Sequence, residues 1–363
     1  MLRISTATIV AALALTLAAC GGSASGGAAA PDRLDPSADL AEQSLTISNW
    51  DKYMPADLPA KFKAKTGAPV TVTKHVTNEE IVAKLTAGGD SGIDVAFVSG
   101  QFAQALNEQG LLEPIHADLI PNLGNLYPEA TRLAYDKGNT FSVPYTWGTT
   151  GLCYRSDLTG YTPDSWNDLL KPRPELKKKI TMLATERWLM LPAQKSLGFS
   201  ANTRDKGQMD QVKSVLVKAK ENLLAFDDAT FGDRLKSGEA ALAEAWDGWC
   251  PTDRKDIKFA VPKEGSDLWV DTMVILKSSK NKEAAHALIN YILEPEVHGW
   301  AAANILYKVP NKLAMEKVDP ALVKSHPHLA MPPGDLLKGE GLVDLGEAAP
   351  TYTQIATEVA AKK

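Results

Sequence analysis

The pattern of apolar and polar positions alternates between a strand-like period and a helix-like period along most of the chain. Residues 45–48, Leu-Thr-Ile-Ser, open as a strand, and Leu58 and Phe62 then recur four positions apart, as on one face of a helix. The stretch "NEEIVAKL" predicts a helix capped by Asn78, and "GIDVAFVSG" predicts a short buried strand that ends at Ser99. Strands separated by helices at this spacing favour a parallel or mixed sheet and therefore an α/β fold.

Two β-rich runs interrupt this alternation, at residues 140–158 and 257–276, and neither contains a helix long enough to cover it. We interpret each run as a crossing between two lobes and expect a third crossing near Val318. Helical patterns lie between the runs, and a long amphipathic helix, broken near Pro295, follows the second. We therefore predict two α/β lobes joined by β-type crossings, with a ligand cleft between them. The N-terminal lobe would comprise residues 44–147 and 270–317, and the C-terminal lobe residues 148–269 and 318–363.

The first residues have the organisation of a secretion signal, with Arg3 as a basic start, an apolar run at residues 9–17 and small residues before Cys20. We predict a signal peptide at residues 1–19, because the apolar run is shorter than the ~20 residues that a transmembrane helix needs. The ending Leu-Ala-Ala-Cys resembles the bacterial lipobox, which implies a lipid on Cys20, an extracytoplasmic location and membrane contact through this anchor only. Residues 20–43 would form a flexible tether, since stretches of Gly, Ser and Ala cannot bury a core.

Two further cysteines, Cys153 and Cys250, remain in the mature chain. Outside the cytosol a disulfide between them is a natural prediction. Two buried free thiols are the alternative, and the sequence alone does not decide the geometry that a bridge requires.

Charge and motifs exclude several function classes. The chain carries 39 Lys and Arg residues against 44 Asp and Glu residues, with a formal net charge of −5 and no basic patch, so we expect no nucleic-acid partner. The sequence contains no Walker A loop, no Gly-x-Ser-x-Gly elbow and no His-Glu-x-x-His motif. His326 and His328 lie in a Pro-rich loop without a third ligand nearby, which is typical of surface residues. We therefore expect no metal and no cofactor.

Aromatic residues stand next to acids in two motifs at predicted strand ends, where α/β folds bind ligands. "NWDKY" contains Trp50, Asp51 and Tyr53, and "WVD" contains Trp269 and Asp271, which strand alternation places on one face. An Asp beside a core Trp is poorly tolerated unless it is paired, which favours ligand stacking for both Trp residues. The alternative for Asp51 is a cap on the incoming turn, and for Asp271 a capping or hinge role.

A third motif, "AWDGWC", places Trp246, Asp247 and Trp249 together. Each Trp could be ordinary core, the common position of buried aromatic residues. We interpret Trp246 as a ligand-stacking residue and leave both alternatives open for Trp249. Asp247 is a further ligand candidate, with holding a loop as its alternative.

Several segments in order resemble the periplasmic spermidine/putrescine-binding proteins of ABC importers, over nearly the whole mature chain. "NWDKYMPADLPAKFKAKTG" is similar to that family's opening strand and helix, "FSVPYTWGTTGLCY" to its first crossing, and "PKEGSDLWVDTMVI" to its second. "NKEAAHALINYILEPEV" and "YKVPN" are similar to the segments that follow. The resemblance implies a periplasmic-binding-protein-like fold that closes around one polyamine. It also implies delivery of that polyamine to permease subunits of an ABC transporter.

The resemblance further implies a set of pocket residues. They are Trp50, Tyr53, Ser99, Trp246, Trp269, Asp271 and Tyr307. The chain departs from the family pattern at Thr185 and Trp188, where relatives usually carry acids, and at Leu342, where they often carry an amide. It also has Asp51 where a small hydroxyl is common. We keep Thr185 and Trp188 as ligand-binding positions and expect that the loss of acids there favours a short diamine.

The expected function is that of an extracytoplasmic, monomeric lipoprotein that binds a putrescine- or spermidine-type cation and is not an enzyme. Aromatic faces suit the methylenes and charges of such a ligand, and carboxylates suit its ammonium groups. One alternative keeps the fold and changes the ligand to another small organic cation or amino compound. A second alternative is an envelope enzyme that acts on amines, which would need a nucleophile, cofactor or metal constellation that the sequence does not display.

Overall fold

The computed structural model describes residues 34–361, and the folded body extends from Pro36 onward. The predicted signal peptide, residues 1–19, and the predicted lipidation site, Cys20, lie outside the described residues. A 3₁₀ turn, η1 (Leu40–Glu42), is capped by Asp39, and the Gln43 side chain accepts a hydrogen bond of 2.9 Å from the backbone N–H of Ala284. The flexible tether predicted for residues 20–43 is therefore wrong at its C-terminal end, because these residues are held against the body.

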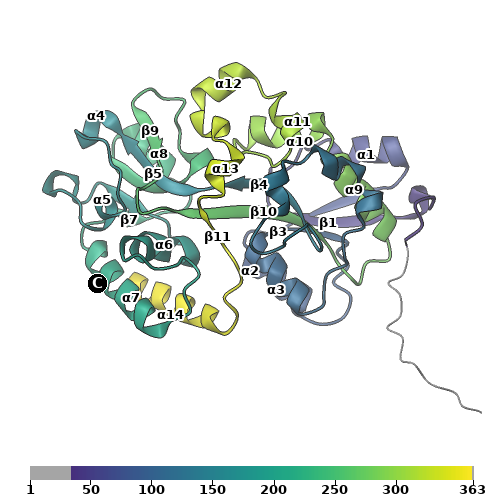
Figure 1. The fold of residues 1–363 in the computed structure, drawn as a ribbon, viewed down its shortest axis with the longest axis horizontal. Helices are drawn as coiled ribbons and strands as arrows, with labels where there is room; N and C mark the ends of the chain where they lie inside the picture. The colour runs from purple at the N-terminus through teal and green to yellow at the C-terminus, as the bar shows by residue number, and fades with distance from the viewer. Residues whose placement is uncertain (1–33, 362–363) are drawn as a thin grey trace, which may run out of the picture. The chain divides into compact units, whose positions relative to one another are not determined.

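The first sheet has six strands in the order β11-β10-β3-β1-β2, and β4 pairs with β10 from Trp269 to Met273. Strands β1, β2 and β3 are parallel, whereas β10 runs antiparallel to both β3 and β4. The strands are β1 (Leu45–Asn49), β2 (Val70–Lys74), β3 (Val95–Ser99), β4 (Val143–Gly148), β10 (Asp267–Ile275) and β11 (Glu340–Gly341). In Figure 1, β10 crosses the centre of the body.

The second sheet has five strands in the order β7-β6-β8-β5-β9. They are β5 (Thr150–Arg155), β6 (Ile180–Met182), β7 (Ala225–Phe226), β8 (Leu242–Trp246) and β9 (Ile257–Ala260). The first β-rich run of the sequence is thus β4 and β5, with Thr149 between them, and the second is β9 and β10. Each run carries the chain from one sheet to the other, as the pattern predicted, and the mixed α/β fold class is confirmed.

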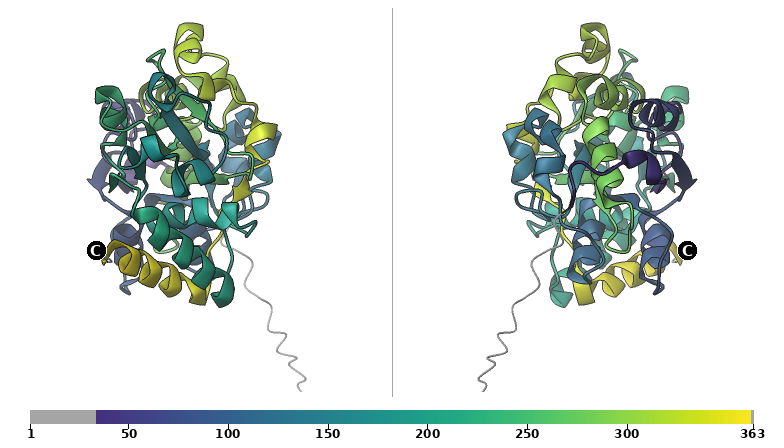
Figure 2. Two further views of the ribbon diagram at one scale, coloured as in Figure 1. Left: turned by 90° about the vertical axis from the view of Figure 1, so that its left-hand side faces the viewer. Right: turned by 90° about the vertical axis from the view of Figure 1, so that its right-hand side faces the viewer.

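Helices cover the sheets and connect their strands. The helices of the first half are α1 (Leu58–Thr66), α2 (Asn78–Thr86), α3 (Gly100–Glu108), α4 (Ser156–Thr159), α5 (Asn167–Leu170), α6 (Glu186–Ser196), α7 (Lys206–Lys220) and α8 (Phe231–Ser237). Those of the second half are α9 (Lys282–Ile292), α10 (Pro295–Asn304), α11 (Lys312–Met315), α12 (Pro320–Ser325), α13 (Pro333–Leu336) and α14 (Ala349–Ala361). The end-on views of Figure 2 show α14 beside α6 and α7, against which it packs. No helix within residues 34–361 combines the length and apolarity that crossing a bilayer would require.

Local patterns explain most of these elements. Leu58 and Phe62 are buried on α1, and the break predicted near Pro295 separates α9 from α10. The predicted cap at Asn78 is wrong, because Thr77 caps α2 by accepting the N–H of Glu80. The Asn78 side chain instead accepts a 2.9 Å hydrogen bond from the backbone N–H of Ser99, which fastens α2 to the end of β3.

The two sheets separate the strands of residues 45–148 from those of residues 150–260, as two lobes would require. Strand β11 pairs with β10 in the first sheet although residues 318–363 were assigned to the C-terminal lobe. The lobe boundaries, residues 44–147 with 270–317 and residues 148–269 with 318–363, remain a prediction.

Cys153 and Cys250 are joined by a disulfide across a sequence separation of 97. Cys153 lies in the middle of β5, and Cys250 follows the 3₁₀ turn η6 (Asp247–Trp249) at the end of β8. Both residues are fully buried. The bridge therefore ties the turn η6 to β5, the strand between β8 and β9 in the second sheet.

Candidate functional site

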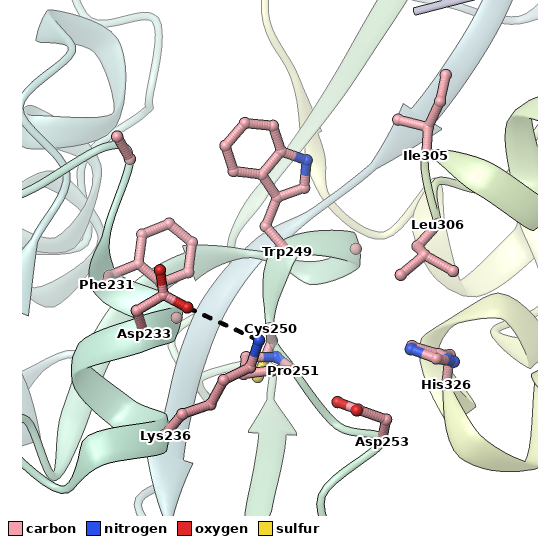
Figure 3. Close-up of a pocket in the computed structure, with 13 residues that line it drawn as sticks. Phe231, Asp233, Lys236, Trp249, Cys250, Pro251, Asp253, Ile305, Leu306 and His326 are labelled. Carbon is pink, nitrogen blue, oxygen red and sulfur yellow. Dashed lines mark ion pairs between the residues drawn. The ribbon is translucent and has the colours of Figure 1, made fainter. Parts of the chain in front are cut away.

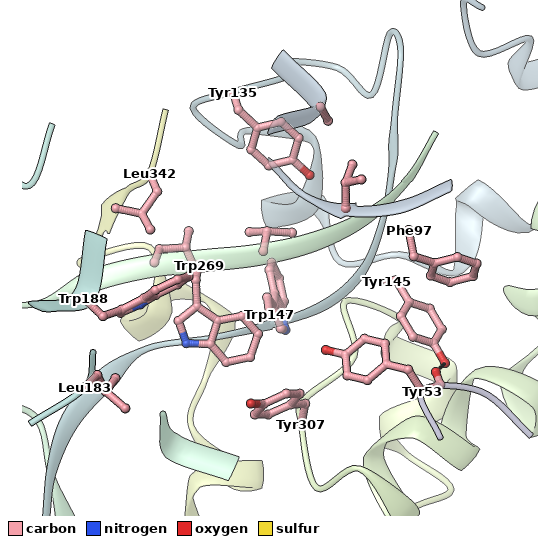
Figure 4. Packing of buried hydrophobic residues seen from close by; sticks show 14 of the residues in the cluster. Tyr53, Phe97, Tyr135, Tyr145, Trp147, Leu183, Trp188, Trp269, Tyr307 and Leu342 are labelled. Carbon is pink, nitrogen blue, oxygen red and sulfur yellow. Dashed lines mark hydrogen bonds between the residues drawn. The ribbon is translucent and has the colours of Figure 1, made fainter. Parts of the chain in front are cut away.

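A cavity of about 520 Å³ is lined by segments of both sheets and by α2, α6 and α14. Ten of the predicted ligand-binding residues line it. They are Trp50, Asp51, Tyr53, Ser99, Thr185, Trp188, Trp246, Trp269, Asp271 and Tyr307. Figure 4 shows Tyr53, Tyr307, Trp269 and Trp188 in one packed row below β10. Segments far apart in the sequence thus converge on a single cavity, as the two-lobe prediction requires of a ligand cleft.

Asp271 is the most enclosed carboxylate of this cavity. Its Oδ2 accepts a 2.6 Å hydrogen bond from the Tyr53 hydroxyl, and its Oδ1 accepts a 2.7 Å hydrogen bond from the Ser99 hydroxyl. Burial raises the pKa of Asp271 above its ordinary value, and no basic side chain within residues 34–361 lowers it. The carboxylate is therefore oriented by neutral hydroxyls and lacks a cationic partner.

The aromatic rings form a continuous row through the cavity. Trp50 meets Tyr53 at 5.2 Å between centroids, Tyr53 meets Tyr307 at 6.3 Å, and Trp269 meets Tyr307 at 4.6 Å. Edge-to-face and tilted arrangements of this kind leave parts of several ring faces turned to the open space. The row offers an apolar, electron-rich lining to a ligand.

Trp188 is held by a buried acid behind the cavity. Its indole Nε1–H donates a 2.9 Å hydrogen bond to Oδ2 of Asp267 at the start of β10. Asp267 also accepts a hydrogen bond from the backbone N–H of Thr150, 2.8 Å away. The first turn of α6 is thereby fixed to the crossing strands, so the ring of Trp188 keeps a defined orientation.

Two predicted residues lie at the cavity but have their polar groups engaged. Asp51 is an exposed rim residue whose Oδ1 lies 2.5 Å from the Nζ of Lys74, and that hydrogen bond lowers the pKa of Asp51. The hydroxyl of Thr185 donates to Oδ2 of Asp228 at 3.0 Å. Asp51 is thus partly neutralised by Lys74, and Thr185 holds the start of α6 in place.

Asp247 does not line the cavity, in contrast to the prediction of a ligand contact. It is 1 % exposed, it accepts the backbone N–H of Gly248 at 2.9 Å, and its Oδ2 has no hydrogen-bond partner in the described structure. Burial raises the pKa of Asp247 to about 7, and burial lowers the pKa of the nearby Lys308 to about 8. Asp247 therefore lies behind the cavity wall, where its Oδ1 and the ring of Trp269 both approach Gly148.

Sequence reasoning missed several residues of the lining. The additional acids are Glu79, Glu186 and Asp344, and the additional rings are Phe102 and Tyr352. Trp249, for which the sequence left two alternatives open, also lines the cavity. Glu186 is adjacent to the predicted positions Thr185 and Trp188, so its place in the first turn of α6 was a usable signal. Arg187 also lines the cavity, and its guanidinium is engaged by the carbonyl of Val343 at 2.9 Å. Acids therefore outnumber bases around the opening.

A second cavity, of about 370 Å³, lies on another side of Trp249. Figure 3 shows its lining, including Phe231, Leu306 and the ion pair of Lys236 with Asp233 at 3.8 Å. His326 borders this cavity and His328 is also buried, so the prediction of surface histidines is wrong. The Nε2 of His328 forms a 2.7 Å hydrogen bond with the carbonyl oxygen of Leu306. His328 is thus engaged in packing.

The chain has two mixed sheets connected by strand crossings, and residues from both sheets line an aromatic and acidic cavity. This arrangement is that of a solute-binding protein of the bacterial extracellular type. The family model described as "Bacterial extracellular solute-binding protein" matches residues 57–331, and the chain belongs to this family.

Individual relatives agree with this assignment. The chain is 31% identical over 315 residues to the "Spermidine/putrescine-binding periplasmic protein" of Salmonella typhimurium, which covers 86% of this chain and 90% of the relative. Among solved structures it is similar to the spermidine/putrescine ABC transporter substrate-binding protein PotD of Streptococcus pneumoniae, with a TM-score of 0.74, 27% identity and coverage of 87% and 99%. It is also similar to the Tp0655 (TpPotD) lipoprotein of Treponema pallidum, with a TM-score of 0.77, 26% identity and coverage of 87% and 99%. These relatives are solute-binding transport proteins, which agrees with a binding role.

Proposed function

We propose that this protein captures a polyamine of the putrescine or spermidine type outside the cytoplasm and delivers it to the permease of an ABC importer. The observation that carries the proposal is Asp271, a partly buried carboxylate oriented by the hydroxyls of Tyr53 and Ser99 inside an aromatic cavity. Desolvation of an unpaired carboxylate is unfavourable, and an ammonium group relieves it while its methylenes pack on the rings. The names of the relatives support the same class of ligand.

The proposal includes a large part of the ligand-binding set that the sequence predicted. Trp50, Tyr53, Trp246, Trp269 and Tyr307 would pack against the methylenes, and Ser99 would orient the carboxylate. A lipid on Cys20 would hold the monomeric protein at the membrane, close to the permease subunits. The binding role needs no cofactor, since the ligand is released unchanged.

Calorimetric titration of the mature protein with putrescine and spermidine tests the proposal. Asp271→Asn keeps the shape and removes the charge, so it should weaken binding by about 1.5–3 kcal/mol, roughly ten- to a hundredfold. Asp51→Asn is the matched control, because Asp51 is exposed and paired with Lys74, and it should change the affinity little. The proposal fails if the wild-type protein binds no amine, or if Asp271→Asn binds every amine as tightly as the wild type.

The two alternatives give different outcomes in the same assay. Another small organic cation would bind in place of putrescine and still depend on Asp271. An enzyme would convert the amine, so recovery of unchanged putrescine after prolonged incubation, checked by mass spectrometry, supports binding alone.

A further inference from the structure

The two ends of the cavity offer different chemistry. Around Asp271, the hydroxyls of Tyr53 and Ser99 and the carboxylate oxygens provide hydrogen-bonding atoms for an N–H donor. The hydroxyl of Thr146, 2.9 Å from that of Tyr53, is fully buried and supports this group from behind the cavity. This end therefore suits a primary ammonium group, which carries three N–H donors.

The ring contacts lead away from this end. From Tyr307 the row continues to Trp249 at 6.5 Å with nearly parallel planes, and from Trp249 to Trp246 at 5.8 Å with planes 81° apart. Trp246 then meets Trp188 at 5.4 Å with planes 83° apart. These rings form the walls of an aromatic corner, in which Tyr307 is next to Tyr53, whereas Trp246 and Trp188 are three and four ring contacts from Tyr53.

Two polar groups at this corner are engaged elsewhere. The indole N–H of Trp188 is directed to Asp267, at 2.9 Å, and the hydroxyl of Thr185 is donated to Asp228. Glu186, in the first turn of α6, lines the cavity and contributes negative charge. The corner thus attracts a cation but presents mainly ring faces to it.

Trp249 is the least buried ring of the corner. Its side chain is 45 % exposed, whereas large aromatic residues are generally well covered in folded proteins. Figure 3 shows its indole standing between Phe231 and Ile305 in that view. The exposed indole of Trp249 lies at the ligand cavity, nearly parallel to the ring of Tyr307. Its uncovered surface is available for contact with a group of the ligand.

We propose that the cavity selects an asymmetric amine, with a primary ammonium at Asp271 and an N-alkylated ammonium in the corner formed by Trp188, Trp246, Trp249 and Tyr307. A primary ammonium in this corner would lose hydrogen bonds to water that ring faces replace poorly. An N-alkylated ammonium has fewer N–H donors, spreads its charge over methyl groups and interacts best with aromatic cages. This inference rests on the proposed function, since it names the ligand class of the same site.

The test compares ligands of one chain length by calorimetric titration of the mature wild-type protein. The probes are putrescine and its N,N,N-trimethyl derivative, which differ only at one end. We expect the trimethyl compound to bind at least about tenfold more tightly. Equal or tighter binding of putrescine overturns the inference and leaves the proposed function in place, whereas binding of neither probe would count against the proposed function itself.

Variants at Trp249 show whether the ring carries the preference. Trp249→Leu keeps an apolar side chain but removes the π-system, so the affinity ratio of trimethyl compound to putrescine should fall toward one. Trp249→Phe keeps a ring and should retain most of the ratio. An unchanged ratio in Trp249→Leu, or a loss of putrescine binding alone in Glu186→Gln, would overturn the inference, because Glu186 would then be accepting a primary ammonium. The wild-type comparison stands even if a variant fails to fold.

Discussion

At the scale of the residue, the site depends on one carboxylate whose surroundings are polar but uncharged. The hydroxyls of Tyr53 and Ser99 orient Asp271, and they do not neutralise it. Burial therefore raises its pKa, which means that folding favours the protonated form of this side chain. A cationic ligand needs the ionised form, so ligand binding and proton binding oppose each other at Asp271.

Binding should accordingly weaken as the pH falls through the raised pKa of Asp271, at a higher pH than an ordinary Asp would cause. At pH values near this pKa, binding should release protons, which calorimetry detects by repeating the titration in buffers of different ionisation enthalpy. Asp271→Asn should remove that proton release. A constant affinity between neutral pH and pH 4 would contradict the prediction.

The raised pKa of Asp271 has the opposite effect on the stability of the ligand-free protein, which should increase as the pH falls. Because the pKa of Asp271 is higher in the folded than in the unfolded state, its contribution to the free energy of unfolding is unfavourable at neutral pH and improves as the pH falls through the folded pKa. Asp271→Asn should therefore raise the melting temperature of the ligand-free protein at pH 7 and reduce the further rise caused by putrescine. Thermal unfolding with and without ligand measures both effects. A lower melting temperature of the ligand-free variant would show that lost hydrogen bonds outweigh the relief of desolvation.

At the scale of the element, the crossing from β4 to β5 brings the cavity wall together. Gly148, the last residue of β4, lies opposite Trp269 on β10. A Cβ at this position would overlap the ring of Trp269 and would stand 2.5 Å from Oδ1 of Asp247. The close approach of three elements here requires a residue without a side chain.

Gly148→Ala should therefore displace the ring of Trp269 and weaken both the fold and amine binding. The expected loss of stability is about 1–3 kcal/mol, typical of overpacking in a buried region, measured by urea unfolding. Gly124→Ala is the matched control, because nothing lies within 4 Å of its added methyl group. If Gly148→Ala keeps the stability and the affinity of the wild type, the cavity wall accommodates the added methyl group and the prediction is wrong.

At the scale of the whole molecule, the disulfide couples the second sheet to the cavity. It ties Cys153 on β5 to Cys250 beside η6, the turn that carries Trp249. Cys153 also lies in the part of β5, Leu152 to Tyr154, that pairs with both β8 and β9. The bridge closes a long loop, so in the chain-entropy account it restricts the unfolded chain strongly.

Replacement of both cysteines by Ala should lower the free energy of unfolding by about 4–5 kcal/mol, as expected for a loop of about 100 residues. Guanidinium unfolding of the oxidised wild type, the reduced wild type and the double variant measures the change. The reduced wild type and the double variant should have similar midpoints. An unchanged midpoint on reduction would refute a stabilising role for the bridge.

Local sequence patterns determined the elements and a large part of the candidate site. The period of Leu58 and Phe62 predicted α1, and the alternation in "WVD" placed Trp269 and Asp271 on one face of β10, where both line the cavity. These predictions hold because the spacing of side chains along a strand or helix is set by the backbone and is independent of distant parts of the chain.

Tertiary structure alone decided which of the predicted site residues line the cavity without a polar partner elsewhere in the protein. Asp51 meets Lys74 because β1 and β2 pair in a register that sets Asn49 beside Lys74, and Trp188 is directed by Asp267, 79 residues away. Asp247 points behind the wall because of the turn η6. Sequence establishes residue types and their local face, but charge pairing and burial depend on residues that only folding brings together, and these determine whether a carboxylate binds a ligand or holds the wall.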